Sequence, residues 1–321
     1  FDASARDLTM EAAAAAGLPD PVLLEEPQAA LYAWIGATRG AWRKQVNVGD
    51  VILVCDVGGG TTDLSLIAVS EEEGDLTLTR VAVGEHILLG GDNMDLALAH
   101  QVRSRMAREG TRLDGWQFLE LGHACRSAKE AILTNAAVTR LPVAIAGRGS
   151  KLVGGTLRAE VLRSEAEQVL LEGFFPEVDI SSRPREARGL GLAEWGLEYA
   201  ADAAITSHLA AFLARHCGAL ADVSDRSSDA SRAAGFAMPT AVLFNGGVFR
   251  STLLRARLLG ILDRWLEDSG APPARELGAR DMEQAVALGG ATFAWVREGK
   301  GLRIRGGLGH AYYVGVESAM P

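Results

Sequence analysis

The clearest pattern along the chain is a change of hydrophobic period after residue 50. The run VILVCDV at 51–57 is almost wholly apolar, which is typical of a buried strand. A glycine cluster separates it from DLSLIAVS at 63–70, and the charged turn EEEGD separates that run from LTLTRVAVG at 76–84. Because strands joined by such short connections pair with their neighbours, the pattern predicts an antiparallel meander of three strands.

Helical spacing surrounds this meander. The alanine-rich segment 2–16 predicts a helix, and Glu26-Pro27 predicts the start of a second, since proline is favoured in a first turn. A polar connection is expected over 36–49. Further helices are predicted over 92–108, 117–133, 158–175, 194–217, 253–266 and 282–296, the last with a capping box of Asp281 and Gln284.

Short apolar runs predict two more strands, over 137–145 and 241–244. The segment 176–191, rich in Pro, Arg, Ser and Gly, predicts a surface loop, and the polar stretch 221–235 predicts a mobile connection. No internal repeat is visible. The pattern by itself gives an α/β class and no more.

The strongest candidate for chemistry is DVGGGTTD, from Asp56 to Asp63, between two predicted strands. Three consecutive glycines allow a sharp turn and leave backbone N–H groups accessible, which is what binding of phosphate oxygens requires. The hairpin brings both carboxylates together, where they could hold hydrated magnesium, and Thr61 adds a hydroxyl. A glycine-rich hairpin can also be a simple turn. The segment lacks the Gly-Lys-Ser/Thr of a Walker loop and the following helix of a dinucleotide fingerprint.

This segment resembles the second phosphate-binding loop of the actin, sugar-kinase and heat-shock 70 superfamily. Further segments, in the same order, resemble the heat-shock protein 70 (DnaK-type) chaperone family in particular. They are the helix, connection and EPQAAL helix of 1–31, LGGDNMD at 89–95, ACRSAKEAI at 124–132 and VLFNGGVFR at 242–250. On these segments the chain is identified as a member of that family, with its nucleotide-binding domain represented.

The resemblance implies an actin-like ATPase (ribonuclease H-like) fold of the α/β class. We expect residues 1–49 to be a remnant of lobe I, 50–283 to form lobe II with a nested helical subdomain at about 92–165, and 284–298 to form a return helix. Residues 299–321 would then be a linker and, at YYVGVES, the first strand of a peptide-binding domain. The family's first phosphate loop and catalytic lysine precede the matched segment. We therefore expect lobe I to be largely missing and this chain alone to hydrolyse ATP poorly.

The resemblance implies individual site roles, with ATP or ADP and Mg²⁺ as ligands. Catalytic roles fall to Glu26, Thr61 and Asp63, and magnesium is contacted through water by Asp56, Asp63 and Glu26. Nucleotide contacts fall to Gly58, Gly59, Gly60, Thr61, Gly91, Lys129, Gly246, Gly247, Arg250 and Glu283. Glu26 could also be a capping acid at a helix start, Glu283 would equally suit a helix N-terminus, and Arg250 could be an ordinary solvated arginine.

Three positions of the adenosine-contacting helix depart from the family. Where the family has an acid, an arginine that sandwiches adenine, and a serine, this chain has Arg126, Glu130 and Leu133. Val248 also replaces a small hydroxyl residue after the paired glycines. The adenine clamp is therefore altered, which puts nucleotide affinity and base preference in question.

Composition narrows the partners. The 321 residues are 48% hydrophobic with a formal net charge of -9, so nucleic acid and anionic membranes are not expected as partners. No apolar run approaches the roughly 18 residues of a membrane span. The three cysteines are far apart, which favours buried thiols in a reducing, cytoplasmic setting. The six histidines lack the spacing of metal ligands.

Three functions remain open at this stage. The leading hypothesis is an ATP-binding and ATP-hydrolysing molecular chaperone in protein folding, with unfolded polypeptide clients and cochaperones as partners of the parent protein. The second is a non-enzymatic regulatory or interaction module with weakened nucleotide binding. The third is another actin-fold ATPase or sugar kinase, which would leave LGGDNMD and ACRSAKEAI unexplained.

Overall fold

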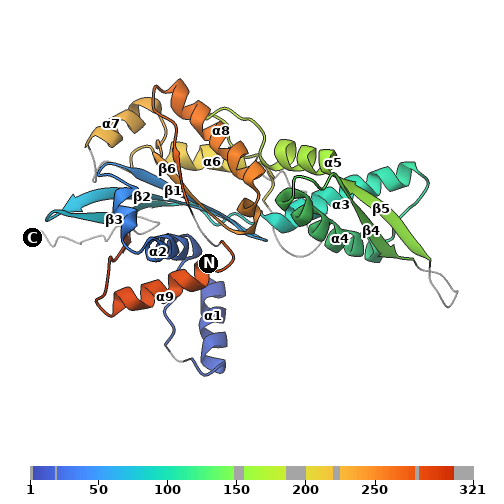
Figure 1. Ribbon diagram of the computed structural model, residues 1–321, viewed down its shortest axis with the longest axis horizontal. Coiled ribbons are helices and arrows are strands. Elements are labelled where there is room, and N and C mark those ends of the chain that lie inside the picture. The colour runs from blue at the N-terminus through green and yellow to red at the C-terminus, as the bar shows by residue number, and fades with distance from the viewer. Residues whose placement is uncertain are drawn as a thin grey trace, which may run out of the picture.

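A mixed six-stranded sheet forms the centre of the fold, in the order β7-β6-β1-β2-β3-β8 (Figure 1). The computed structural model describes residues 3–18, 20–147, 155–185, 200–219, 225–278 and 282–306. The strands β1 (Val51–Val57), β2 (Thr62–Glu72) and β3 (Asp75–Val83) pair antiparallel in sequence order, which confirms the predicted meander. Parallel pairs are added by β6 (Ala241–Asn245), β7 (Arg275–Leu277) and β8 (Arg305–Gly306).

Helices cover both faces of this sheet, and this explains the continuous apolar run of β1. One face packs against α2 (Glu26–Thr38) and α9 (Ala285–Arg297), and the other against α6 (Ile205–Arg215) and α8 (Thr252–Asp268) (Figure 1). All seven residues of β1 are buried. A strand covered on both sides needs apolar residues at every position rather than at alternate ones.

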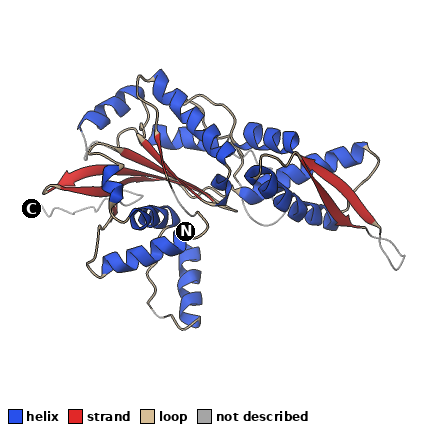
Figure 2. Cartoon of the chain, viewed as in Figure 1, coloured by secondary structure: helices blue, strands red, loops and turns tan. Residues whose placement is uncertain are grey.

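A second, smaller unit lies at one end of the molecule and has its own apolar core (Figure 2). Its hairpin of β4 (Arg140–Ala146) and β5 (Thr156–Leu162) packs against α3 (Gly91–Arg108), α4 (Gly115–Thr134) and α5 (Arg163–Gln168). A π-helical segment, Val169–Phe174, leads back to the main core. The placement of α3 and α4 matters most for the site described below.

The prediction of one helix over 158–175 was wrong for its first residues, which belong to β5, and helical structure is confirmed from Arg163 to Phe174. Residues of β5 alternate, with Leu157, Ala159 and Val161 packed in the core of the smaller unit, and helix begins only at Arg163. The alternation of apolar residues outweighed helix propensity in this segment because α3 and α4 cover one face of the hairpin.

Other predicted boundaries of helices and loops also differ from those observed. The segment 221–235 is not simply a connection, because it contains α7 (Asp225–Ala234). The long helix predicted over 194–217 begins only at Ile205, and 194–199 lie outside the described residues. The polar connection over 36–49 contains the end of α2 and a short 3-10 helix, Ala41–Lys44. Asp281 and the YYVGVES segment also lie outside the described residues.

The cysteines differ in their surroundings. Cys55 and Cys125 are buried, as predicted, whereas Cys217 is partly exposed. Burial raises the pKa of the Cys125 thiol to about 12, which leaves it protonated and unreactive at neutral pH. None of the helices within the described residues combines the length and the apolar character needed to cross a membrane.

The crossing of α2 and α9 depends on a glycine. A Cβ atom at Gly289 would lie 1.9 Å from the carbonyl oxygen of Ala29, whereas one at Gly290 would meet nothing within 4 Å. We expect Gly289→Ala to lower the free energy of unfolding by about 2 kcal/mol or more, because the two backbones must separate. Gly290→Ala should instead stabilise by about 0.5–1 kcal/mol, since alanine favours a helix. Urea denaturation of both variants measures the difference, and equal effects would contradict the tight crossing.

Candidate functional site

The glycine hairpin between β1 and β2 is an exposed turn held at both ends. Asp56 and Asp63 are directly opposite each other in the strand register, so the hairpin brings their backbones together as predicted. The turn is closed by the N–H of Gly58, which donates to the carbonyl oxygen of Thr61 at 2.9 Å. Gly59 and Gly60 are exposed.

The first N–H groups of α3 fix this turn by binding the carbonyl oxygens of the turn. The N–H groups of Gly91 and Asp92 donate to the carbonyl oxygens of Gly58 and Gly59, at 3.0 and 2.7 Å. The N–H groups of Gly59, Gly60 and Thr61 donate no hydrogen bond to any residue that the structure describes. Three successive backbone donors are therefore available to an anion, on a turn in which the carbonyl groups of Gly58, Gly59 and Thr61 are already engaged.

Glycines allow three segments to converge at this point. Gly246 has φ +86°, and a Cβ atom there would lie 2.2 Å from the carbonyl oxygen of Val57 and 2.7 Å from Oδ1 of Asp56. A Cβ atom at Gly90 would lie 2.5 Å from the carbonyl oxygen of Gly59. Side chains at either position would displace the turn.

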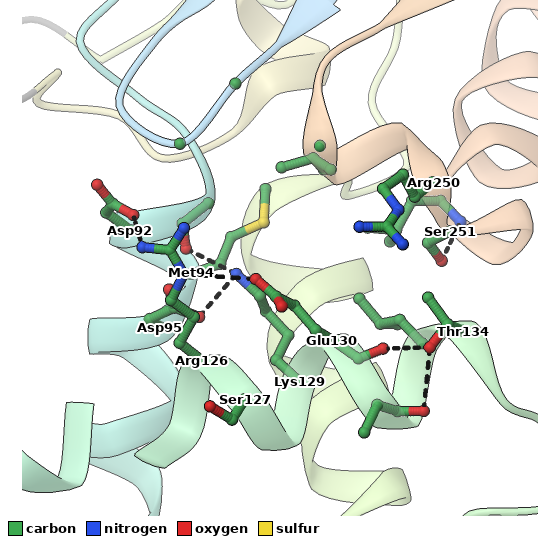
Figure 3. Close-up of a pocket in the computed structure, with 18 residues that line it drawn as sticks. Asp92, Met94, Asp95, Arg126, Ser127, Lys129, Glu130, Thr134, Arg250 and Ser251 are labelled. Atoms are coloured by element: carbon green, nitrogen blue, oxygen red, sulfur yellow. Dashed lines mark hydrogen bonds and ion pairs between the residues drawn. The ribbon is translucent and has the colours of Figure 1, made fainter. Parts of the chain in front are cut away.

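An open cavity of ≈ 430 Å³ lies beside the turn, a volume within the range of small-molecule sites (Figure 3). Its walls come from the glycine turn, α3, α4, and the segment that joins β6 to α8. Six predicted contact residues line it: Gly58, Gly59, Gly91, Lys129, Gly247 and Arg250. The other predicted residues lie outside its lining: Glu26, Asp56, Gly60, Thr61, Asp63, Gly246 and Glu283.

Acidic groups lie at the base of the turn. Asp56 is only 3% exposed, and its Oδ2 accepts a 2.7 Å hydrogen bond from Nδ2 of Asn245. Burial raises the pKa of Asp56 to about 6, and the negative charges of Glu26 and Asp63 add to this effect, while the bond from Asn245 opposes it. Asp63 Oδ1 lies 2.8 Å from Nδ1 of His86. A positive charge placed here would therefore be stabilised.

These acids do not form a ready cage for a metal ion. In the part of the chain that the structure describes, no group of three or more His, Cys, Asp or Glu side chains is placed to hold one. Magnesium at this position would need oxygen ligands from water or from a bound phosphate, which is the way this ion commonly binds beside phosphates.

Lys129 connects the two helices of the cavity wall. Its Nζ lies 2.7 Å from Oδ1 of Asp95 and donates a 2.9 Å hydrogen bond to the carbonyl oxygen of Gly91 (Figure 3). Both charged side chains are buried. Burial raises the pKa of Asp95, and the lysine opposes that shift. The ammonium group therefore already has two acceptors, an arrangement that the sequence did not predict.

The altered clamp residues do face the cavity. Arg126, Glu130 and Leu133 line it on α4, with Val248 on the facing segment. On the opposite wall, Arg250 forms an ion pair with Glu283. The sequence predicted each of these two as a nucleotide contact but not that they pair.

Sequence reasoning missed Asp92, Asp95, His86 and Asn245. Asp92 and Asp95 stand in the LGGDNMD segment at a helix start, where acidic residues are common, so spacing gave no separate signal. Asn245 directly precedes the paired glycines and is the polar residue at the end of β6, a strand that is otherwise apolar and is buried at every position. That contrast could have identified it, because buried polar side chains need a partner.

One comparison with known proteins bears on this site. The family model described as Hsp70 protein matches residues 1–172, which is more than half of the 321 residues. The match includes the glycine turn, the start of α3 and all of α4. This family is one of nucleotide-binding chaperones with an actin-like ATPase fold, and the observed α/β fold with a mixed sheet agrees with it. The chain belongs to the Hsp70 family.

Proposed function

We propose that the cavity binds ATP or ADP with Mg²⁺ and that the protein is an ATP-hydrolysing chaperone. One observation carries this proposal: three successive backbone donors, at Gly59, Gly60 and Thr61, have no acceptor among the described residues and lie on a turn that borders a cavity of nucleotide size. Phosphate oxygens are acceptors that such a turn fits. Family membership favours this function over a sugar kinase.

The order of the lining residues suggests how the nucleotide would lie. The β- and γ-phosphates would contact Gly58, Gly59, Gly60 and Thr61. The ribose and α-phosphate would pass Gly91, Lys129, Gly246 and Gly247, and the base would lie between α4 and Arg250, near Glu283. This direction is supported by Figure 3, in which Asp92, whose N–H donates to Gly59 of the turn, and Arg250 lie on opposite sides of the cavity.

The acidic residues fit a role for Mg²⁺. Burial is the main cause of the raised pKa of Asp56, and the negative charges of Glu26 and Asp63 add to it. Carboxylate oxygens are ligands that hydrated magnesium prefers. When bound with the phosphates, the ion would neutralise part of their charge. We assign Asp56 and Asp63 to hold its water molecules, and Glu26 to orient the attacking water, with Thr61 contacting the γ-phosphate.

We expect hydrolysis by this chain alone to be slow. Charge stabilisation around the transferred phosphoryl group supplies most of the rate in such reactions. The side chains that line the cavity include as many acids as bases: Asp92, Asp95, Glu130, Arg126, Lys129 and Arg250. Lys129 and Arg250 are each already paired with a carboxylate. The cavity wall therefore offers little net positive charge to the phosphates.

The division into lobes is part of the proposal. We assign residues 1–49 to a remnant of lobe I, 50–283 to lobe II, 92–165 to its nested subdomain, 284–298 to a return helix, and 299–321 to a linker and strand. Apolar side chains exposed on α1 (Ala3–Ala15) and α9 support a contact surface on these two helices. They are Leu8, Val286, Leu288 and Trp295. Nucleotide-dependent rotation of the lobes would then control a peptide-binding region with unfolded clients and cochaperones.

Calorimetric titration of Mg²⁺-ATP and Mg²⁺-ADP tests the proposed site. We expect saturable binding by the wild-type protein, and Asp63→Asn to weaken it by about tenfold or more with Mg²⁺ but much less in EDTA, because the change removes a carboxylate near the ion. Asp75→Asn is the matched control, since Asp75 is exposed at the other end of the hairpin from Asp63. Absence of saturable binding by the wild-type protein would contradict the proposal.

One observation favours the rival function, a module that keeps the fold with weakened nucleotide binding. The charged groups near the proposed base position are engaged with each other, since Arg250 forms an ion pair with Glu283. A base would have to compete with this contact. A folded protein that binds no nucleotide in the titration above would support this alternative.

A further inference from the structure

We propose that Arg126 is a phosphate-binding residue that leaves Asp92 when a nucleoside diphosphate or triphosphate occupies the turn at 58–61. The proposal rests on the nucleotide site proposed above and assigns to it a cation that the family pattern does not have at this position. It also makes Asp92 the group that holds this cation while the phosphates are absent.

The three basic residues of the cavity wall differ in how firmly they are held. Lys129 is buried, with acceptors at 2.7 and 2.9 Å. Arg250 forms a close ion pair with Glu283. Arg126 has only longer contacts, its Nη1 at 3.6 Å from Asp92 and its Nε at 3.4 Å from Glu130, and its side chain is 57% exposed. Arg126 is therefore the basic group of the cavity wall that can change partner at least cost.

Asp92 places this arginine next to the turn. The backbone N–H of Asp92 donates to Gly59, and a Cβ atom at Gly59 would lie 3.5 Å from Oδ1 of Asp92. The guanidinium group of Arg126 points to that same carboxylate from α4 (Figure 3). Phosphates on the turn would thus arrive within a few ångströms of both the carboxylate and the guanidinium group.

The charges favour an exchange of partners. Two or more negative charges on the turn would repel the Asp92 carboxylate and attract Arg126. A guanidinium group binds phosphate through paired, charge-assisted hydrogen bonds, which are stronger than a contact of 3.6 Å between exposed side chains. The exchange requires only side-chain movement, since both residues are exposed.

The exchange would connect phosphate occupancy to the smaller unit. Arg126 belongs to α4, which packs with α3, β4 and β5 around a separate apolar core. A contact from α4 to the phosphates would add to the fixed link that Lys129 makes between α4 and α3. Occupancy of the turn by phosphates, rather than the base, would then set how firmly α4 is held over the cavity.

Affinity measurements on charge variants test the exchange. We expect Arg126→Gln to weaken Mg²⁺-ADP and Mg²⁺-ATP by about tenfold, with adenosine changed by less than about twofold, because a charge-assisted phosphate contact is lost. Asp92→Asn should strengthen both nucleotides by about threefold, since it removes a repelling carboxylate and frees the arginine. Arg126→Lys should lie between wild type and Arg126→Gln.

Arg140→Gln is the matched control, because Arg140 lies in the same unit, is 67% exposed and makes a similar 3.7 Å contact with Glu160 away from the cavity. Circular dichroism confirms that each variant is folded. If Arg126→Gln binds Mg²⁺-ADP as tightly as Arg140→Gln, or loses adenosine equally, the inference is wrong although the site stands. If the wild-type protein binds neither nucleotide, the proposed function itself fails.

Discussion

Gly246→Ala is expected to lower the free energy of unfolding by about 3 kcal/mol or more, through a strained backbone and a clash with a neighbouring strand. Gly246 has φ +86°, a conformation that residues with a side chain rarely adopt. The new methyl group would lie 2.2 Å from the carbonyl oxygen of Val57, which is part of a strand buried at every position and cannot yield easily. Urea denaturation followed by circular dichroism measures the loss.

The adjacent glycine provides the control. A Cβ atom at Gly247 would meet nothing within 4 Å, and its φ is not positive. Gly247→Ala should therefore change the free energy of unfolding by less than about 0.5 kcal/mol. Equal losses in the two variants would show that the close approach of Gly246 to β1 is not what stabilises this junction.

Asp56→Asn is expected to make the protein more stable at neutral pH and to weaken its Mg²⁺-dependent nucleotide binding. The buried carboxylate has its pKa raised from 3.8 to about 6, so its charge destabilises the folded state. Above pH 6 this difference in pKa corresponds to a destabilisation of about 3 kcal/mol, and an asparagine amide would not cause it. The new amide oxygen can still accept the hydrogen bond from Asn245.

The pH dependence of the stability tests whether the charge of Asp56 destabilises the folded protein. Between about pH 4 and pH 6 the folded wild-type protein keeps a proton on Asp56 that the unfolded chain has lost. Raising the pH through this window therefore destabilises the wild-type protein, and this cost is complete above pH 6 and absent below pH 4. The gain from Asp56→Asn should accordingly disappear as the pH falls from 7 to 4.

Chemical denaturation at pH 4, 5, 6 and 7, without nucleotide or Mg²⁺, measures this gain for Asp56→Asn against wild type. Asp75→Asn, at an exposed position, serves as the control for replacing a carboxylate with an amide. A variant that is less stable than wild type at pH 7 would contradict a destabilising charge at position 56. Greater stability with weaker Mg²⁺-nucleotide binding would show that the carboxylate is kept at a cost in stability for the sake of the site.

The elements that the sequence predicted correctly are those whose pattern is local. The meander of β1, β2 and β3 follows from apolar runs separated by tight turns, and the opposite placement of Asp56 and Asp63 follows from the hairpin that joins them. The helix prediction over 158–175 failed at residues 158–162 because β5 is a strand only through its pairing with β4 and its cover by two helices. The short strands β7 and β8 carry no pattern long enough to read.

Family membership and the glycine turn were thus determined by the sequence itself, because a rare string of residues carries both the resemblance and the backbone freedom of the turn. Only the tertiary structure decided which charges are paired. It joined Lys129 to Asp95 across two helices, and Asn245 to Asp56 across residues 189 positions apart in the chain. Electrostatic interactions depend on distance and burial in space, and spacing along a chain does not fix either one.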